Sequence, residues 1–177
     1  MSAIDLLIEG KRLKIALVAE KKKRFLDLLL LGDEQESMID RYLEHGDLWV
    51  LSDENVAIAV AVVTVEQNGI CELKNLAVDT SYQQHGIGSF LLQYLFNQYR
   101  KSCHTIYVGT GQTQRTLNFY KKNGFIYSHR IKNFFLDNYD HPIVDEGLLL
   151  RDMVYLKRKL KTAISVRNGN FLSEEHT

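Results

Sequence analysis

The hydrophobic pattern near the N-terminus predicts one strand followed by two helices. After a weakly patterned lead-in, apolar and polar residues alternate over 12–18, as expected of a strand at the edge of a sheet. Apolar residues then recur at helical spacing over 20–31, where Gly32 is a typical C-terminal stop. A second helical pattern covers 33–45 and ends at Gly46.

Beyond residue 46 the pattern takes the two-residue period of strands, with helices in between. The Asn68-Gly69 pair predicts a tight hairpin turn between two of these strands. The expected strands cover 47–51, 57–66, 70–78, 105–109, 125–131 and 153–158, and the expected helices cover 89–100 and 113–123. An antiparallel meander followed by strand–helix–strand crossovers implies an α/β fold, with a central mixed, mostly antiparallel sheet of six or seven strands and helices on both faces.

Composition narrows the class of protein. The chain has 177 residues, 45% of them hydrophobic and 25% charged, which indicates one ordinary globular domain. A mostly disordered chain and a disulfide-stapled miniprotein are therefore excluded. We expect the domain to cover 1–160, because the stretch 161–177 loses all periodicity and has the character of a mobile tail.

Charge and targeting signals exclude further classes. Lysine plus arginine number 22 and aspartate plus glutamate 22, and this balance argues against a general nucleic-acid binder. No apolar run approaches the roughly 20 residues of a membrane span, and Asp5 and Glu9 make the N-terminus unlike a secretory signal. We therefore expect a cytoplasmic protein without nucleic-acid or membrane partners, in which Cys71 and Cys103 are reduced rather than paired. Neither these cysteines nor the histidine spacing fits a metal site.

A glycine-containing segment after the strand that ends at Val78 is the best candidate for a binding site. Its sequence over 83–89 is QQHGIGS, and a helix follows at once. Gly86 and Gly88 let the backbone curl so that successive N–H groups point into one concavity. The helix N-terminus adds unpaired donors and the positive end of its dipole. Together these features predict a pyrophosphate site that needs no lysine or arginine.

Three glycine-rich motifs compete for this segment. A dinucleotide site requires a third glycine where Leu91 stands, the glycine pair over 109–111 lacks one too, and the P-loop pattern is absent. The acyl-CoA loop Q/R-x-x-G-x-G/A fits, because Gln83, Gly86 and Gly88 occupy its three positions. The alternative is a plain strand–turn–helix in which the glycines serve sterics only.

The stretch 75–92, NLAVDTSYQQHGIGSFLL, resembles motif A of the GNAT N-acetyltransferase superfamily. Downstream, LNFYKKNGF over 117–125 resembles the second hallmark of that superfamily, an aromatic-tyrosine helix that runs into Gly-Phe. Residues 109–111 and the segment 133–153 are similar to a bacterial subgroup of acetyltransferases without an assigned substrate. The resemblance covers roughly 13–160 and implies a GNAT-like fold with acetyl-CoA as cosubstrate.

The resemblance also implies which residues hold acetyl-CoA. The backbone of Leu76, Ala77 and Val78 would contact the pantetheine arm and the thioester carbonyl, where a developing oxyanion needs a preorganised donor. The pyrophosphate would be held by Gln83, Gln84, His85, Gly86, Ile87, Gly88 and Ser89.

At some positions this sequence departs from the pattern of the GNAT superfamily. Gln84 stands where the family often has glycine, and Thr113 stands at about the position of an asparagine that often contacts the cofactor. Asn118, one helical turn later, is the remaining candidate for that contact. Tyr120 would lie near the thioester sulfur and protonate the leaving thiolate. The alternative for Tyr120 is a core tyrosine with its hydroxyl at the surface.

The implied reaction is direct attack of a primary amine on acetyl-CoA, and its harder proton transfer depends on the amine. An alkyl amine of pKa about 10.4 is only ~0.04% neutral at pH 7, which costs ~4.6 kcal/mol. Leaving a thiolate of pKa near 8.5 unprotonated costs only ~2 kcal/mol at that pH. The base is therefore the more demanding partner for an alkyl amine, whereas an aromatic amine is already neutral.

Glu72 is the candidate base, in a context that resembles the family's E-x-x-N-[LI]-A-V strand. The alternative is an exposed strand glutamate paired with a lysine. Asn75 is the candidate for orienting the amine, and its alternative is a hydrogen bond at a strand bulge. A water relay without a dedicated side chain stays open as well.

Two further segments are candidates for the acceptor site. The stretch 33–54 holds eight acidic residues against one basic residue, Arg41, and an acidic wall would favour a cationic acceptor. Its alternative is a solvated helix face. An aromatic segment precedes the only proline, Pro142, and contains Phe134, Phe135, Tyr139 and His141. This loop would shape the acceptor pocket, or else pack as a lid or a dimer contact.

The resulting hypothesis is an N-acetyltransferase that transfers the acetyl group of acetyl-CoA to the primary amine of a small molecule in a ternary complex. A different class is a non-catalytic acyl-CoA-binding module with a regulatory role. A third is a protein or peptide N-acetyltransferase, which would need an open peptide groove. The resemblance makes a homodimer possible, and no metal is expected.

Overall fold

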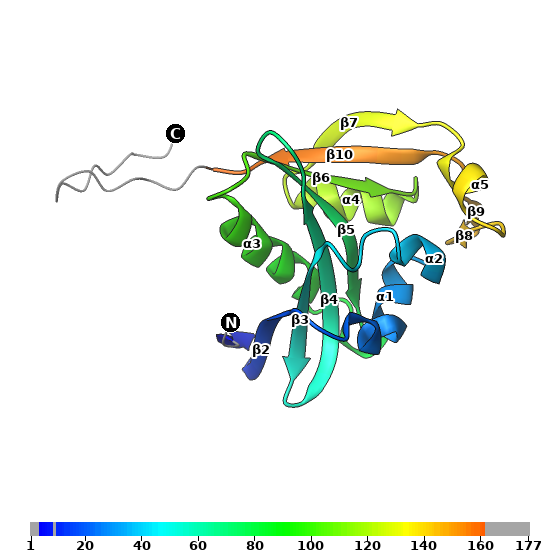
Figure 1. Ribbon diagram of the computed structural model, residues 1–177. Coiled ribbons are helices and arrows are strands. Elements are labelled where there is room, and N and C mark those ends of the chain that lie inside the picture. The colour runs from blue at the N-terminus through cyan, green and yellow to red at the C-terminus, as the bar shows by residue number, and fades with distance from the viewer. Residues whose placement is uncertain (1–3, 9, 162–177) are drawn as a thin grey trace, which may run out of the picture.

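The computed structural model describes residues 4–8 and 10–161 of the chain, with an eight-stranded sheet at its centre (Figure 1). The predicted tail lies outside the described residues, apart from Lys161. The strands are β1 (Ile4–Ile8), β2 (Lys11–Val18), β3 (Asp47–Asp53), β4 (Val56–Val65), β5 (Ile70–Val78), β6 (Thr105–Thr110), β7 (Ile126–Ile131) and β10 (Met153–Lys159), with β8 (Val144–Asp145) and β9 (Leu148–Leu149) as a separate small hairpin. The helices are η1 (Lys22–Phe25), α1 (Leu26–Gly32), α2 (Glu36–Ile39), η2 (Thr80–Tyr82), α3 (Ile87–Tyr99), α4 (Gln114–Lys122) and α5 (Phe134–Asn138).

The sheet is mixed and mostly antiparallel, as predicted. Its strand order is β1-β2-β3-β4-β5-β6-β10-β7, and only β5 and β6 are parallel. It has one strand more than expected, because β1 in the weakly patterned lead-in pairs with β2. The strand predicted at the edge is therefore an inner strand. Helices α3 and α4 cover one face, and α1 and α2 cover the other (Figure 1).

A bulge in β5 changes which face of the sheet its side chains meet. Val62 of β4 lies opposite Asn75 while the next residue, Val63, lies opposite Leu73, so Lys74 is the extra residue. Before the bulge, Leu73 packs in the core beneath α3, and after it Ala77 packs in the core beneath α1. One inserted residue has this effect because side chains alternate between faces with a period of two.

The sheet opens between β5 and β6 directly after this bulge. The two strands pair only from Ile70 with Thr105 to Leu73 with Val108. Beyond that point β5 continues to Val78 and β6 to Thr110, and Figure 1 shows the two halves of the sheet running in different directions. The backbone edge of β5 over 74–78 is therefore not covered by β6, although β4 still pairs with the other edge.

The helix predicted over 33–45 is much shorter in the structure. Helix α2 spans Glu36–Ile39, and turns follow as far as Gly46. The ammonium of Lys22, 8% exposed, donates hydrogen bonds to the carbonyls of Leu43, Glu44 and Gly46 at 2.7–3.0 Å. These carbonyls accept hydrogen bonds from Lys22 instead of continuing a helix. The pattern of residues 33–45 does not indicate this distant partner, so the shorter helix could not be predicted from it.

Candidate active site

The segment 83–89 has the bent conformation that a pyrophosphate site needs. Gln84 and Gly86 have left-handed backbones with φ of 65° and 76°. Helix α3 begins at Ile87, and its first backbone bond runs from the N–H of Phe90 to the carbonyl of Gly86 at 3.0 Å. The N–H groups of residues 87–89 consequently have no acceptor within the helix, and no side chain caps it. Ile87, Gly88 and Ser89, which carry these donors at the positive end of the helix dipole, all line one concave space.

A groove of about 660 Å³ runs along this segment, between the end of β5 and helix α4. Most of the predicted cofactor residues line it: Leu76, Val78, Gln83, Gln84, Gly86, Ile87, Gly88, Ser89 and Asn118. Ala77 is buried on the opposite face of the sheet, and His85 is exposed beside the groove. A Cβ at Gly88 would lie 3.2 Å from the Phe119 ring, so this glycine lets α3 and α4 approach. The residues present therefore fit a CoA diphosphate.

Two cations in the groove were not predicted from the sequence. Arg115 and Lys122 of α4 both line it, and Arg115 lies 3.5 Å from Glu146. The Gln83 side-chain amide donates a hydrogen bond to the Val78 carbonyl at 3.0 Å, which fixes the loop to the end of β5. Asn118 accepts a hydrogen bond from the Gln114 amide at 2.6 Å. Spacing alone could not identify these cations, because lysine and arginine are common on exposed helix faces.

Tyr120 lies where the groove meets a second space, the central cavity, of about 270 Å³. The side chain is 7% exposed and packs edge-on against the rings of Phe119 and Phe125 at 5.1 and 5.4 Å. Burial raises the pKa of the Tyr120 hydroxyl, so it keeps its proton at neutral pH. This hydroxyl makes no hydrogen bond to the residues that the structure describes, and it is free to serve a bound group.

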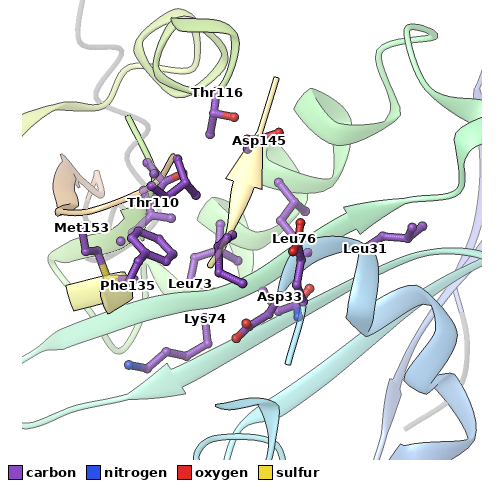
Figure 2. Close-up of a pocket in the computed structure, with 18 of the residues that line it drawn as sticks. Leu31, Asp33, Leu73, Lys74, Leu76, Thr110, Thr116, Phe135, Asp145 and Met153 are labelled. Atoms are coloured by element: carbon purple, nitrogen blue, oxygen red, sulfur yellow. The ribbon is translucent and has the colours of Figure 1, made fainter. Parts of the chain in front are cut away.

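The central cavity lies where β5 and β6 separate. Figure 2 shows Leu73, Lys74 and Leu76 from β5, with Thr110 at the end of β6. Other elements close the cavity, with Asp33 after α1, Thr116 of α4, Phe135 of α5, Asp145 of β8 and Met153 of β10. A side cavity, also about 270 Å³, shares Asp33, Leu73, Lys74, Gly109, Tyr139 and Met153 with it. The central cavity therefore adjoins both the side cavity and the groove.

Glu72 lies on the wall of the side cavity, in an ion pair. Its Oε1 is 3.0 Å from the Lys74 ammonium and accepts a hydrogen bond from the Tyr155 hydroxyl at 3.0 Å. This is the ion pair with a lysine that the sequence left as the alternative. Both donors contact the same carboxylate oxygen, Oε1.

Asn75 is 3% exposed and holds three elements together at the bulge. Its amide donates to the Leu29 carbonyl at 2.9 Å and to the Tyr42 hydroxyl at 3.0 Å. Its Oδ1 has no partner among the described residues and lies against Gly32, where a Cβ would be only 2.2 Å away. The hydrogen bond at a strand bulge, the alternative to amine binding, is thus present.

The acidic stretch and the aromatic segment meet at the cavities. Asp33 and Glu34 line the central cavity, whereas Glu36 and Asp40 pair with Lys23 outside it. The Tyr139 hydroxyl donates to Asp33 Oδ1 at 2.6 Å, the Asp140 N–H donates to Gln35, and Arg41 donates to Asn138. The aromatic segment is thereby fastened over the site by three hydrogen bonds to residues 33–41.

Comparisons with known proteins agree with this geometry. The acetyltransferase (GNAT) domain profile matches residues 44–127. The uncharacterized N-acetyltransferase YvbK of Bacillus subtilis is 35% identical over 150 residues, which cover 82% of this chain and 96% of YvbK. The chain belongs to the GNAT acetyltransferase family. As a GNAT N-acetyltransferase it has the predicted fold and class of enzyme.

Solved GNAT structures share the fold over most of the chain. A GNAT family acetyltransferase from Elizabethkingia anophelis with acetyl-CoA bound is 33% identical, with a TM-score of 0.79 over 84% of this chain and 98% of that one. A Bacillus subtilis acetyltransferase in complex with CoA is 33% identical, with a TM-score of 0.77 over 84% and 99%. The IAA acetyltransferase of Bacillus cereus is 28% identical, with a TM-score of 0.78 over 84% and 99%.

Across residues 4–8 and 10–161, no three histidine, cysteine, aspartate or glutamate side chains gather closely enough to hold a metal ion. None of the helices within these ranges is long and apolar enough to cross a membrane.

Proposed function

We propose that the protein transfers the acetyl group of acetyl-CoA to the primary amine of a small molecule, by direct attack in a ternary complex. The observation that carries this proposal is the position of Tyr120 where the groove meets the central cavity. Two substrates that enter from the two sides would meet beside its hydroxyl. Acetyl-CoA and CoA are bound in related structures, which supports the same cosubstrate here.

Acetyl-CoA would lie in the groove with its diphosphate at the N–H groups of residues 87–89. Arg115 and Lys122 would add positive charge to the same groove. The uncovered backbone edge of Leu76, Ala77 and Val78 would bind the pantetheine arm and the thioester carbonyl. Preorganised backbone donors at such a carbonyl stabilise the oxyanion that forms during attack.

The amine would enter through the cavities beyond Tyr120. Once it has lost a proton, its nitrogen forms a bond to the thioester carbon, the carbon–sulfur bond breaks, and the nitrogen releases its second proton to water as the amide forms. The Tyr120 hydroxyl, which burial keeps protonated at neutral pH by raising its pKa, gives its proton to the leaving thiolate and regains one from water. The small, walled cavities favour a small acceptor over a peptide.

Release of free thiol tests the proposal directly. The purified protein is mixed with acetyl-CoA and a panel of alkyl amines, aromatic amines, amino acids, polyamines and aminoglycosides, and thiol is measured with a chromogenic disulfide. We expect turnover with at least one small amine. Tight CoA binding without thiol release would favour the regulatory module instead, and turnover restricted to peptides would favour a protein acetyltransferase.

Glu72 stays our candidate for accepting the ammonium proton, directly or through water, despite its ion pair with Lys74. Glu72→Gln should lower kcat/KM for alkyl amines by about 100-fold, the lower end of the usual general-base effect. Aromatic amines are already neutral at pH 7 and should lose less than twofold by the same reasoning. Steady-state kinetics with both classes of amine measure the two losses in kcat/KM. Equal losses would show that Glu72 does not accept the ammonium proton.

A further inference from the structure

Asp33 is a partly buried carboxylate that lines both the central cavity and the side cavity. Both of its oxygens are held by phenols. Tyr42 donates to Oδ2 at 3.1 Å and Tyr139 to Oδ1 at 2.6 Å. Because Tyr42 in turn accepts from Asn75, the carboxylate is fixed by residues from three separate parts of the chain.

Arg41 and Lys74 line the side cavity together with Asp33, but each of these cations is engaged by another side chain. Within the described ranges Asp33 forms no ion pair, since Lys74 is paired with Glu72 and the Arg41 guanidinium donates to Asn138. Burial raises the pKa of Asp33, and the two phenols and Arg41 offset only part of that effect. A partly desolvated anion of this kind is stabilised by a cation that enters the cavity.

The other residues around Asp33 indicate the chemistry of the uncharged part of such a cationic ligand. Met38, Phe134, Met153 and Tyr155 give the side cavity thioether and aromatic surface, and its polar wall also includes Arg41, His45, Glu66, Glu72 and Lys74. Apolar walls with a few fixed polar groups are typical of small-molecule sites, in which the polar group sets the orientation of the ligand. Aromatic rings also attract ammonium groups.

We infer that Asp33 binds the ammonium of the acceptor, a primary alkylamine with an apolar body, and so selects cationic acceptors over neutral molecules of the same shape. This inference rests on the proposed function, and it adds a substrate-binding residue and a substrate class to it. Asn75 then acts as a positioning residue, because it fixes Tyr42 and the end of α1, from which Asp33 projects. The inference is therefore tested with a substitution of Asp33 and not of Asn75.

Phenethylamine and 2-phenylethanol are suitable probes, since they share a shape but only the amine is charged at neutral pH. Their binding to the CoA-loaded protein is measured by calorimetry, which needs no turnover. We expect the wild type to bind the amine about 10-fold more tightly, as one charge-assisted hydrogen bond provides. Asp33→Asn should bind both probes equally, while its Tm shows that it is folded.

A matched variant separates the charge of Asp33 from a general loss of negative charge. Asp27→Asn removes an exposed carboxylate from the preceding helix, α1, and should retain the preference for the amine. A wild type that does not prefer the amine, or an Asp33→Asn protein that still does, would overturn the inference. Thiol release by the wild type is scored separately, so failure of the proposed function is distinguishable from failure of this one.

Discussion

Replacing Tyr120 by phenylalanine should lower kcat by about 30-fold to 100-fold, while the Kd for acetyl-CoA stays within about twofold. The lower limit follows from the cost of expelling an unprotonated thiolate at pH 7, about 2 kcal/mol for a thiol of pKa near 8.5. The upper limit is typical of a lost general acid. Tyr120 makes no hydrogen bond to the described residues, so the change removes only the proton donor and leaves the packing of the ring intact.

Tyr94→Phe is the matched control for this result. Tyr94 lies on α3, packs edge-on against Trp49 at 5.5 Å, and is not one of the residues that line the groove. Both variants lose one phenol oxygen, and both should keep the Tm of the wild type. Stopped-flow or steady-state thiol release gives kcat, and calorimetry gives the Kd. An unchanged kcat in Tyr120→Phe would show that water or the bulk solvent protonates the thiolate.

The strands were predictable because their signals are local. The period-two pattern over 70–78 coincides with β5, Ile70–Val78. The hairpin before it was marked by Asn68-Gly69, whose φ angles of 60° and 73° are those of a tight primed turn. The bend within 83–89 was predictable for the same reason, because glycine adopts positive φ more readily than other residues and Gly86 does so here.

The hydrogen bonds between the acidic stretch and the aromatic segment could not be predicted, because they join distant parts of the chain. Asp33 and Tyr139 are 106 residues apart, and neither the acidic stretch nor the aromatic segment shows that the other is its partner. Helix α5 has only five residues, too few for a helical period to show. The interactions of Glu72 and Asn75 likewise depend on Tyr155, Tyr42 and the bulge, which a linear pattern does not contain.

Replacing Gly86 by valine should raise the Kd for CoA by about 100-fold, the loss of one or two hydrogen bonds to a charged phosphate. Gly86 has φ of 76°, and a Cβ there would meet no protein atom within 4 Å, so the protein has room for the side chain. A β-branched residue nevertheless avoids positive φ, because its Cβ and branches crowd the backbone. The loop must then rotate and turn its N–H groups away from the concavity, and the new methyl groups would occupy the groove.

Gly10→Val distinguishes the loss of the site from general strain. Gly10 has φ of 78° and also has no protein atom within 4 Å of a Cβ, but it lies in the turn between β1 and β2. Both variants should therefore lose similar stability in a thermal melt, while only Gly86→Val loses CoA in calorimetry. Normal affinity in Gly86→Val would show that the diphosphate is not held by the N–H groups of residues 87–89, and the proposed cofactor site would have to lie elsewhere.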